Sequence, residues 1–240
     1  MGITQVIDEF YVQLPSDTFR KVPIVGQFCW IPAPHLDPVP RILEVERLRP
    51  EEHYASKFMI RNMTDQDFTK ETKLPIKYLS LRETEELIVA KAKKRPAIIV
   101  AADLTIFDDI AQELKRLGLR HLQEESIMVV PLYAIETDEH SGGFPPVMTA
   151  RIKALMYNQF FFCPQTGLGL FNDSIARLDR IHIIKPIHPT YEPKQFSLCP
   201  EALGVLMAML RLLFGAEEEK DMKALKELLL ESLSQEDEPS

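Results

Sequence analysis

Two short apolar segments, each beside or containing a proline, constrain the fold of this chain more than any other feature. Residues 97–101 are Ala-Ile-Ile-Val-Ala, and residues 127–132 are Ile-Met-Val-Val-Pro-Leu. Their length and β-branched content are typical of buried strands. The chain has no glycine-rich phosphate loop of the G-x-G-x-x-G or G-x-x-x-x-G-K-S/T kind, so a doubly wound nucleotide-binding fold is not expected. We expect an α+β fold built on a small, strongly bent β-barrel with helical insertions.

The composition is that of a globular protein that folds around its own core. The chain has 240 residues, of which 45% are hydrophobic and 27% are charged. Its three cysteines, Cys29, Cys163 and Cys199, form no C-x-x-C pair, so we expect reduced core thiols. Residues 1–14 lack the cationic start and apolar run of a secretory signal, and no stretch approaches 18 apolar residues. We therefore expect a cytoplasmic protein with no membrane association.

The charge distribution is uneven along the chain. The net charge is −8, which argues against a protein that coats nucleic acid through bulk positive charge. Residues 41–95 carry 13 Lys and Arg against 10 Asp and Glu, whereas residues 215–240 carry 3 against 9. The acidic charge is therefore concentrated at the C-terminal end.

Periodicity and turn residues predict the elements of the chain. Residues 27–31 are expected to form a strand that Pro32 ends. Residues 39–48 and 54–63 alternate apolar and polar side chains, which predicts a hairpin with its turn at 50–52, followed by a loop at 63–73. Further strands are expected at 97–101, 127–132, 160–163 and 175–184, with a surface loop at 136–143. Helices are expected at 81–91, 105–117, 147–157, 200–214 and 217–233. Ser80 and Glu83 form a capping box before the first helix, and Gly118 ends the second.

A cationic cluster stands at the start of the strand expected at 97–101. Lys93, Lys94 and Arg95 precede Pro96. A guanidinium held at the mouth of a rigid strand presents a planar fork of donors to a phosphate. The cluster therefore predicts a phosphate-contacting site at Arg95, flanked by Lys93 and Lys94.

Four blocks of the sequence resemble, in order, the sequence blocks of the PemK/MazF family. They are Gly26-Gln27-Phe28-Cys29-Trp30-Ile31-Pro32, Lys94-Arg95-Pro96-Ala97-Ile98-Ile99-Val100, Ile127-Met128-Val129-Val130-Pro131 and Ala176-Arg177-Leu178-Asp179-Arg180-Ile181. The resemblance implies an SH3-like barrel, often dimeric, and toxin endoribonuclease activity. It further implies one PemK/MazF-like domain over residues 1–216 with an insertion at about 33–93. An acidic amphipathic helix and tail would follow at 217–240.

The resemblance implies a catalytic role for Arg95 but leaves its partner missing. In the family, this arginine acts with a serine or threonine two residues after the proline of the V-V-P block, with no metal or other cofactor. Here that position is Tyr133, whose hydroxyl lies several Å further from the backbone. A misplacement of about 1 Å can cost two orders of magnitude in rate. Catalysis is therefore expected to be weak or lost.

Two functions remain open from the sequence. The first is a catalytically silent member that binds RNA or protein, with Lys93, Lys94, Trp30 and Tyr133 as substrate-binding residues. The second is a metal-independent endoribonuclease of the toxin–antitoxin type that cleaves single-stranded RNA with Arg95. Candidate partners are single-stranded RNA, a protein partner such as an antitoxin, and a second copy of the chain.

Simpler roles stay open for the same residues. Arg95 can form a structural ion pair with Glu83, Glu85 or Glu86, and Trp30 and Tyr133 can be core aromatics. Zinc sites need three or four ligands, and the histidines at 182 and 188 supply only two. His140 beside Ser141 likewise lacks an orienting third group. No metal site is expected.

Overall fold

The structure is a computed structural model that describes residues 2–47, 56–68, 85–102, 107–118, 125–136 and 143–236. The chain divides into two compact units. The large unit comprises Met1–Pro32 and Lys94–Ser240, and the small unit comprises Ala33–Lys93. The small unit has the bounds of the segment expected as an insertion, although insertion into a PemK/MazF-like domain stays a prediction.

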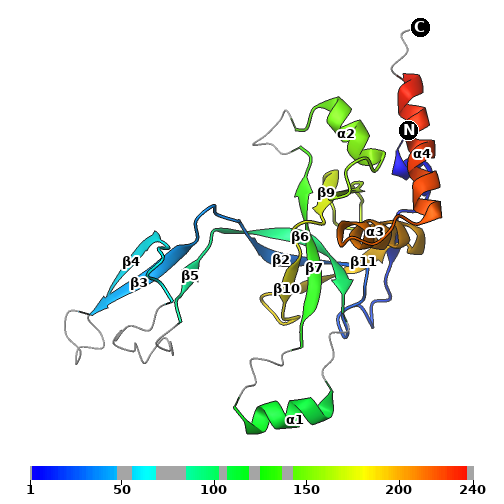
Figure 1. Cartoon of the computed structure of the whole chain (residues 1–240). Helices are drawn as coiled ribbons and strands as arrows, with labels where there is room; N and C mark the ends of the chain where they lie inside the picture. Colours follow the sequence, from blue (N-terminus) through cyan, green and yellow to red (C-terminus); the bar gives the residue numbers. More distant parts are fainter. Residues whose placement is uncertain are drawn as a thin grey trace. The chain divides into compact units, whose positions relative to one another are not determined.

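The large unit is built on an antiparallel sheet that curls into a half-barrel (Figure 1). Its strands lie in the order β1-β11-β2-β6-β7-β9-β8, and β10 pairs with β7. The strands are β1 Tyr11–Gln13, β2 Gln27–Pro34, β6 Ala92–Ala101, β7 Ile127–Ala134, β8 Phe160–Cys163, β9 Ser174–Arg177, β10 His182–Ile184 and β11 Glu192–Leu198. With strands and helices in one chain, the α+β class is confirmed.

Aromatic and β-branched side chains fill the concave side of this sheet. Ile98 and Val130 are completely buried. Phe28 and Phe196 stack with ring centroids 4.5 Å apart and are 1% and 2% exposed. All three cysteines are free and buried, which confirms the expected core thiols.

The described residues of the large unit also form four α-helices. They are α1 Asp108–Arg116, α2 Pro146–Lys153, α3 Pro200–Leu213 and α4 Lys220–Glu236, with a 3₁₀ turn at Ile3–Gln5. Helix α3 contacts β11, and α2 contacts β8 (Figure 1). The Cys199 sulfur accepts a hydrogen bond from the Ala202 N–H at the start of α3. In α4, Met222 and Leu229 are buried in the core. No helix among the described residues is both long and apolar enough to cross a membrane.

The small unit holds a three-stranded antiparallel sheet in the order β4-β3-β5. Strand β3 spans Arg41–Arg47, β4 spans Ser56–Asn62 and β5 spans Ile88–Val89. The β3–β4 pairing runs from Arg41 opposite Asn62 to Arg47 opposite Ser56. The predicted hairpin is thus confirmed, while its turn at 50–52 lies outside the described residues.

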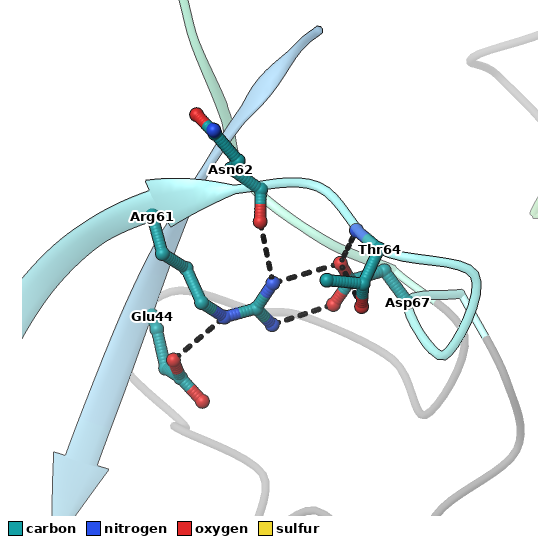
Figure 2. Close-up of polar contacts among 5 residues, drawn as sticks. All are labelled: Glu44, Arg61, Asn62, Thr64 and Asp67. Carbon is teal, nitrogen blue, oxygen red and sulfur yellow. Dashed lines mark hydrogen bonds and ion pairs between the residues drawn. The ribbon is translucent and has the colours of Figure 1, made fainter.

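A polar network joins the end of β4 to the turn that follows it (Figure 2). The Arg61 guanidinium donates to Glu44 of β3 at 2.7 Å and to both carboxylate oxygens of Asp67 at 2.6 and 2.8 Å. The Thr64 N–H donates to Asp67 at 2.8 Å. The Asp67 side chain is only 2% exposed. Hydrogen bonds from Arg61 and Thr64 hold the pKa of the Asp67 carboxyl well below its usual range.

The helix predicted at 81–91 is wrong where the structure describes it. Residues 85–87 have no regular structure, Ile88–Val89 is strand β5, and β6 already begins at Ala92. The Leu43 N–H donates to the Leu87 carbonyl at 2.9 Å. Pairing with β3 therefore overrides the local helix signal. The capping-box residues Ser80 and Glu83 lie outside the described residues.

Several element boundaries also differ from the sequence predictions. Strand β2 continues through Pro32 to Pro34, because a proline is tolerated where a strand position needs no ladder N–H. The strand predicted at 175–184 is two strands, β9 and β10, since the Arg180 N–H closes a turn onto Arg177. Helix α2 ends at Lys153 instead of 157. Gly118 has φ +72° after α1, as predicted.

Candidate functional site

The alternation of β6 divides the predicted cationic cluster. Successive side chains of a strand point to opposite faces, so Lys94 and Arg95 lie on opposite faces of the sheet. Lys94 forms an ion pair with Glu192, whereas Arg95 lies over Tyr133. Lys93 is exposed and is the last residue of the small unit. The predicted site residues therefore form two separate groups in the large unit.

Arg95 and Tyr133 form the first group. Ala97 of β6 pairs with Pro131 of β7, and continuing this register places Arg95 opposite Tyr133. The Arg95 Cζ lies 4.2 Å from the centroid of the Tyr133 ring, a cation–π contact. Both side chains are half-buried. No described carboxylate forms an ion pair with Arg95.

Arg177 of β9 and Phe160 of β8 extend this group across the sheet. Arg177 pairs directly with Phe160, and its Cζ lies 5.3 Å from the Phe160 ring and 6.0 Å from the Tyr133 ring. Arg177 also donates two hydrogen bonds to Asp179, at 2.7 and 2.5 Å. These bonds lower the pKa of Asp179 and raise that of Arg177. We refer to Arg95, Tyr133, Arg177 and Phe160 as the cation–aromatic row.

The row provides donors and ring faces without a residue placed for acid–base chemistry. Tyr133 lies under the guanidinium of Arg95, so its ring supports the arginine. His182 of β10 pairs with Val129, four residues from Tyr133 and thus about 13 Å away along the strand. Burial, with a contribution from Arg180, lowers the pKa of His182. At this separation His182 is too distant to act with Arg95.

Lys94 and Trp30 belong to the second group, on the other face of β6. Trp30 pairs with Glu192 of β11. Glu192 accepts hydrogen bonds from Lys94 at 2.6 Å and from Lys194 at 2.7 Å. Bonds from Lys194 and Lys94 lower the pKa of Glu192 to about 2. These residues border a pocket of about 400 Å³, the Trp30 pocket, lined by Trp30, Lys94, Leu168, Gly169, Phe171, Glu192 and Lys194.

Sequence reasoning missed four of the residues that complete these groups. They are Phe160, Arg177, Glu192 and Lys194. Arg177 and Asp179 are two residues apart across the turn that ends β9, and Glu192 and Lys194 are two residues apart on β11, where such pairs share a face. That spacing could have predicted each ion pair. The contacts of Arg177 with Tyr133 and of Glu192 with Trp30 depend on the order of the strands in the sheet, which the spacing of residues does not reveal.

The remaining candidates from the sequence are histidines, and only some of them lie in the described residues. Across the described parts of the chain, no group of three or more His, Cys, Asp and Glu side chains is arranged to hold a metal ion. His188 is exposed, and His182 is half-buried on β10. His140 and Ser141 lie outside the described residues.

Comparison with known proteins does not assign the chain to a family. Neither protein-family models nor curated protein sequences gave a match. The function therefore has to be argued from the two groups of residues.

Proposed function

We propose that this chain is a divergent PemK/MazF-like protein that binds single-stranded RNA through the cation–aromatic row without cleaving it. One observation carries the proposal. The Arg95 guanidinium rests on the Tyr133 ring at 4.2 Å and has no described carboxylate to neutralise it. It therefore keeps its charge and its free donor edge for an anionic ligand.

The chemistry of the row suits a strand with phosphates and exposed bases. An arginine fork matches the geometry of a phosphate. Aromatic side chains stack on unpaired bases, which contributes about 1 to 3 kcal/mol per base. Phe160 and Tyr133 supply rings, and Arg177 supplies a second guanidinium beside them. Because the net charge of the protein is −8, this attraction is local, and we expect a shallow dependence of affinity on salt.

The proposed fold family is supported by the curled antiparallel sheet of the large unit. In this proposal the half-barrel is a modified SH3-like barrel, with Ala33–Lys93 inserted between its first two blocks. Helix α4 is an addition to the barrel. Its side chains Met222 and Leu229 are buried in the core of the large unit. The apolar face of α4 therefore packs against the chain itself.

The second candidate function is a metal-independent endoribonuclease that uses Arg95. The same unpaired guanidinium favours it, since an arginine can stabilise charge on a phosphate in the transition state. The position of Tyr133 is the argument against it. Tyr133 stands where the family has a short side chain with a hydroxyl group, and its ring contacts the Arg95 guanidinium.

One experiment with two measurements tests both functions. The full chain is mixed with fluorescent single-stranded RNA in EDTA, and anisotropy and strand length are followed. We expect binding with intact RNA, and at least about tenfold weaker binding for Arg95→Ala. The matched control is Arg116→Ala, which removes an exposed arginine that is paired with Glu113 on α1. Unchanged affinity in Arg95→Ala would refute the binding proposal. Cleavage that this variant loses would favour the endoribonuclease.

A further inference from the structure

The Trp30 pocket continues into a second pocket of the large unit. The second pocket has a volume of about 620 Å³, and both are lined by Leu168, Glu192 and Lys194. The residues that only the second one contains include Phe19, Arg20, His188 and Tyr191. Small-molecule sites occupy about 300 to 1,000 Å³. We call the two together the Trp30 groove.

The groove is positively charged in a protein that is negative overall. Arg20, Lys94 and Lys194 line it, and Glu192 is the one carboxylate among the described residues that line it. Glu192 is shared by both lysines. The Arg20 Cζ lies 5.1 Å from the Phe19 ring centroid, and this arginine forms no ion pair with a described residue. A local excess of cations at a concave surface attracts anionic ligands.

Tyr191 borders the second pocket, and its hydroxyl group is buried beside the core residue Cys29. Tyr191 is 7% exposed, and its hydroxyl oxygen is buried with no hydrogen bond among the described residues. Burial raises the pKa of Tyr191, so the phenol keeps its proton at neutral pH. A buried polar group without a partner costs about 1 to 3 kcal/mol.

Aromatic side chains border the cationic end of the groove. Trp30 lines the pocket beside both lysines, and the Lys194 Nζ lies 5.9 Å from its ring centroid. Phe171 borders the same pocket and is 79% exposed. Exposed apolar side chains at the rim of a concave site are typical of ligand-binding grooves.

We infer that the Trp30 groove binds a nucleotide. The base lies against Trp30 and Phe171, and the phosphate accepts hydrogen bonds from Lys194 and Arg20. A nucleotide combines a planar base with an anionic phosphate, so it contacts both the aromatic and the cationic side chains of the groove. An acidic peptide would contact mainly the cationic side chains. A free mononucleotide and one nucleotide of an RNA strand offer this same chemistry. The inference rests on the proposed function only if the ligand is a nucleotide within an RNA strand.

Trp30 makes the inference directly measurable, because it is the single tryptophan of the chain. Its fluorescence in the full chain is followed while AMP, CMP, GMP, UMP, inorganic phosphate or a five-nucleotide RNA is added. We expect saturable quenching by at least one mononucleotide or by the RNA, and none by phosphate alone. Lys194→Met should weaken binding about tenfold, as expected for a charge-assisted contact.

The outcomes separate the two ligand sources and the two sites. Quenching by mononucleotides identifies a free-nucleotide site, and quenching by RNA alone identifies a strand subsite. Arg95→Ala should weaken RNA binding yet leave mononucleotide quenching unchanged, which separates this inference from the proposed function. Lys115→Met, on the exposed surface of α1, controls for a general loss of charge. Absence of quenching by every nucleotide, equal quenching by phosphate, or tighter binding of an acidic peptide would overturn the inference.

Discussion

Arg61 in the small unit and Arg95 in the large unit lie in opposite electrostatic surroundings. Arg61 is held by two carboxylates, with Glu44 at 2.7 Å and Asp67 at 2.6 Å (Figure 2). Arg95 lies on the Tyr133 ring, with no described carboxylate in contact. Both are strand residues of the same chemical type, so the difference comes from their neighbours alone.

The comparison separates a structural arginine from one that remains available to a ligand. Arg61 joins two strands to a turn, and its charge is neutralised by partners within the fold. Cation–π contact positions Arg95 but leaves its charge in place, because an aromatic ring is uncharged. We therefore expect Arg61 to determine stability and Arg95 to determine binding.

Arg61→Ala should give the largest effect, and the effect should be on stability. It leaves Asp67 as a carboxylate that is 2% exposed and lacks its guanidinium partner, and an unpaired buried charge is strongly destabilising. Hydrogen exchange of the β3 and β4 amides should accelerate at least about tenfold. Arg41→Ala, which removes a half-exposed pair with Asp37, is the control and should change exchange little. Equal effects of the two variants would contradict the structural role of Arg61.

Arg95→Ala should leave stability nearly unchanged while it weakens RNA binding. The lost cation–π contact contributes about 0.5 to 1 kcal/mol at an exposed site, so the thermal midpoint should move by only a few degrees. Arg95→Lys keeps the charge but loses the planar fork, and we expect its RNA affinity to lie between those of wild type and Arg95→Ala. Calorimetry and anisotropy on the same samples provide the two readings. A large loss of stability in Arg95→Ala would make Arg95 a structural residue, like Arg61.

Sequence reasoning reached β2, β6, β7 and β8 of the large unit through their apolar runs, but it missed β1 and β11. It reached the β3–β4 hairpin through a different signal, the alternation of apolar and polar side chains. It failed at 81–91, where β5 takes its structure from distant β3 residues that a local capping pattern cannot reveal.

The candidate site was predictable only in part. The resemblance pointed to Arg95 and Tyr133, yet it treated Tyr133 as a poor substitute for a hydroxyl group. The ring contact that makes Tyr133 useful depends on the register between β6 and β7. Likewise, Lys94 and Arg95 are adjacent in sequence and separated by the strand's alternation. Which face each occupies, and which partner it meets, follow from long-range pairing.

Acid should affect the Arg61 network in a defined direction. Because hydrogen bonds from Arg61 and Thr64 lower the pKa of Asp67 in the folded state, the contact stabilises the small unit above the ordinary aspartate pKa, about 4. That stability is lost as the pH falls through the lower folded value. We expect β3 and β4 amide protection, corrected for intrinsic exchange, to fall below about pH 4, and Asp67→Asn to remove most of this dependence. Protection that rises on acidification would reverse the sign we infer.

We expect the smallest effect at Glu192, which lies between Lys194 and Lys94 at the edge of the Trp30 groove. It is intermediate between the two arginines, because it forms ion pairs within the fold, as Arg61 does, and borders a proposed binding site, as Arg95 does. Its folded pKa of about 2 lies below its ordinary value of 4.5. The stabilising contribution of these contacts is thus complete above pH 4.5 and is lost as the pH falls toward 2. In a carboxyl-detected NMR titration, Lys194→Met should raise the Glu192 midpoint more than Lys94→Met does, because the Lys194 bond is the larger cause. A midpoint near 4.5 in the wild-type protein would show that the lysines do not hold Glu192.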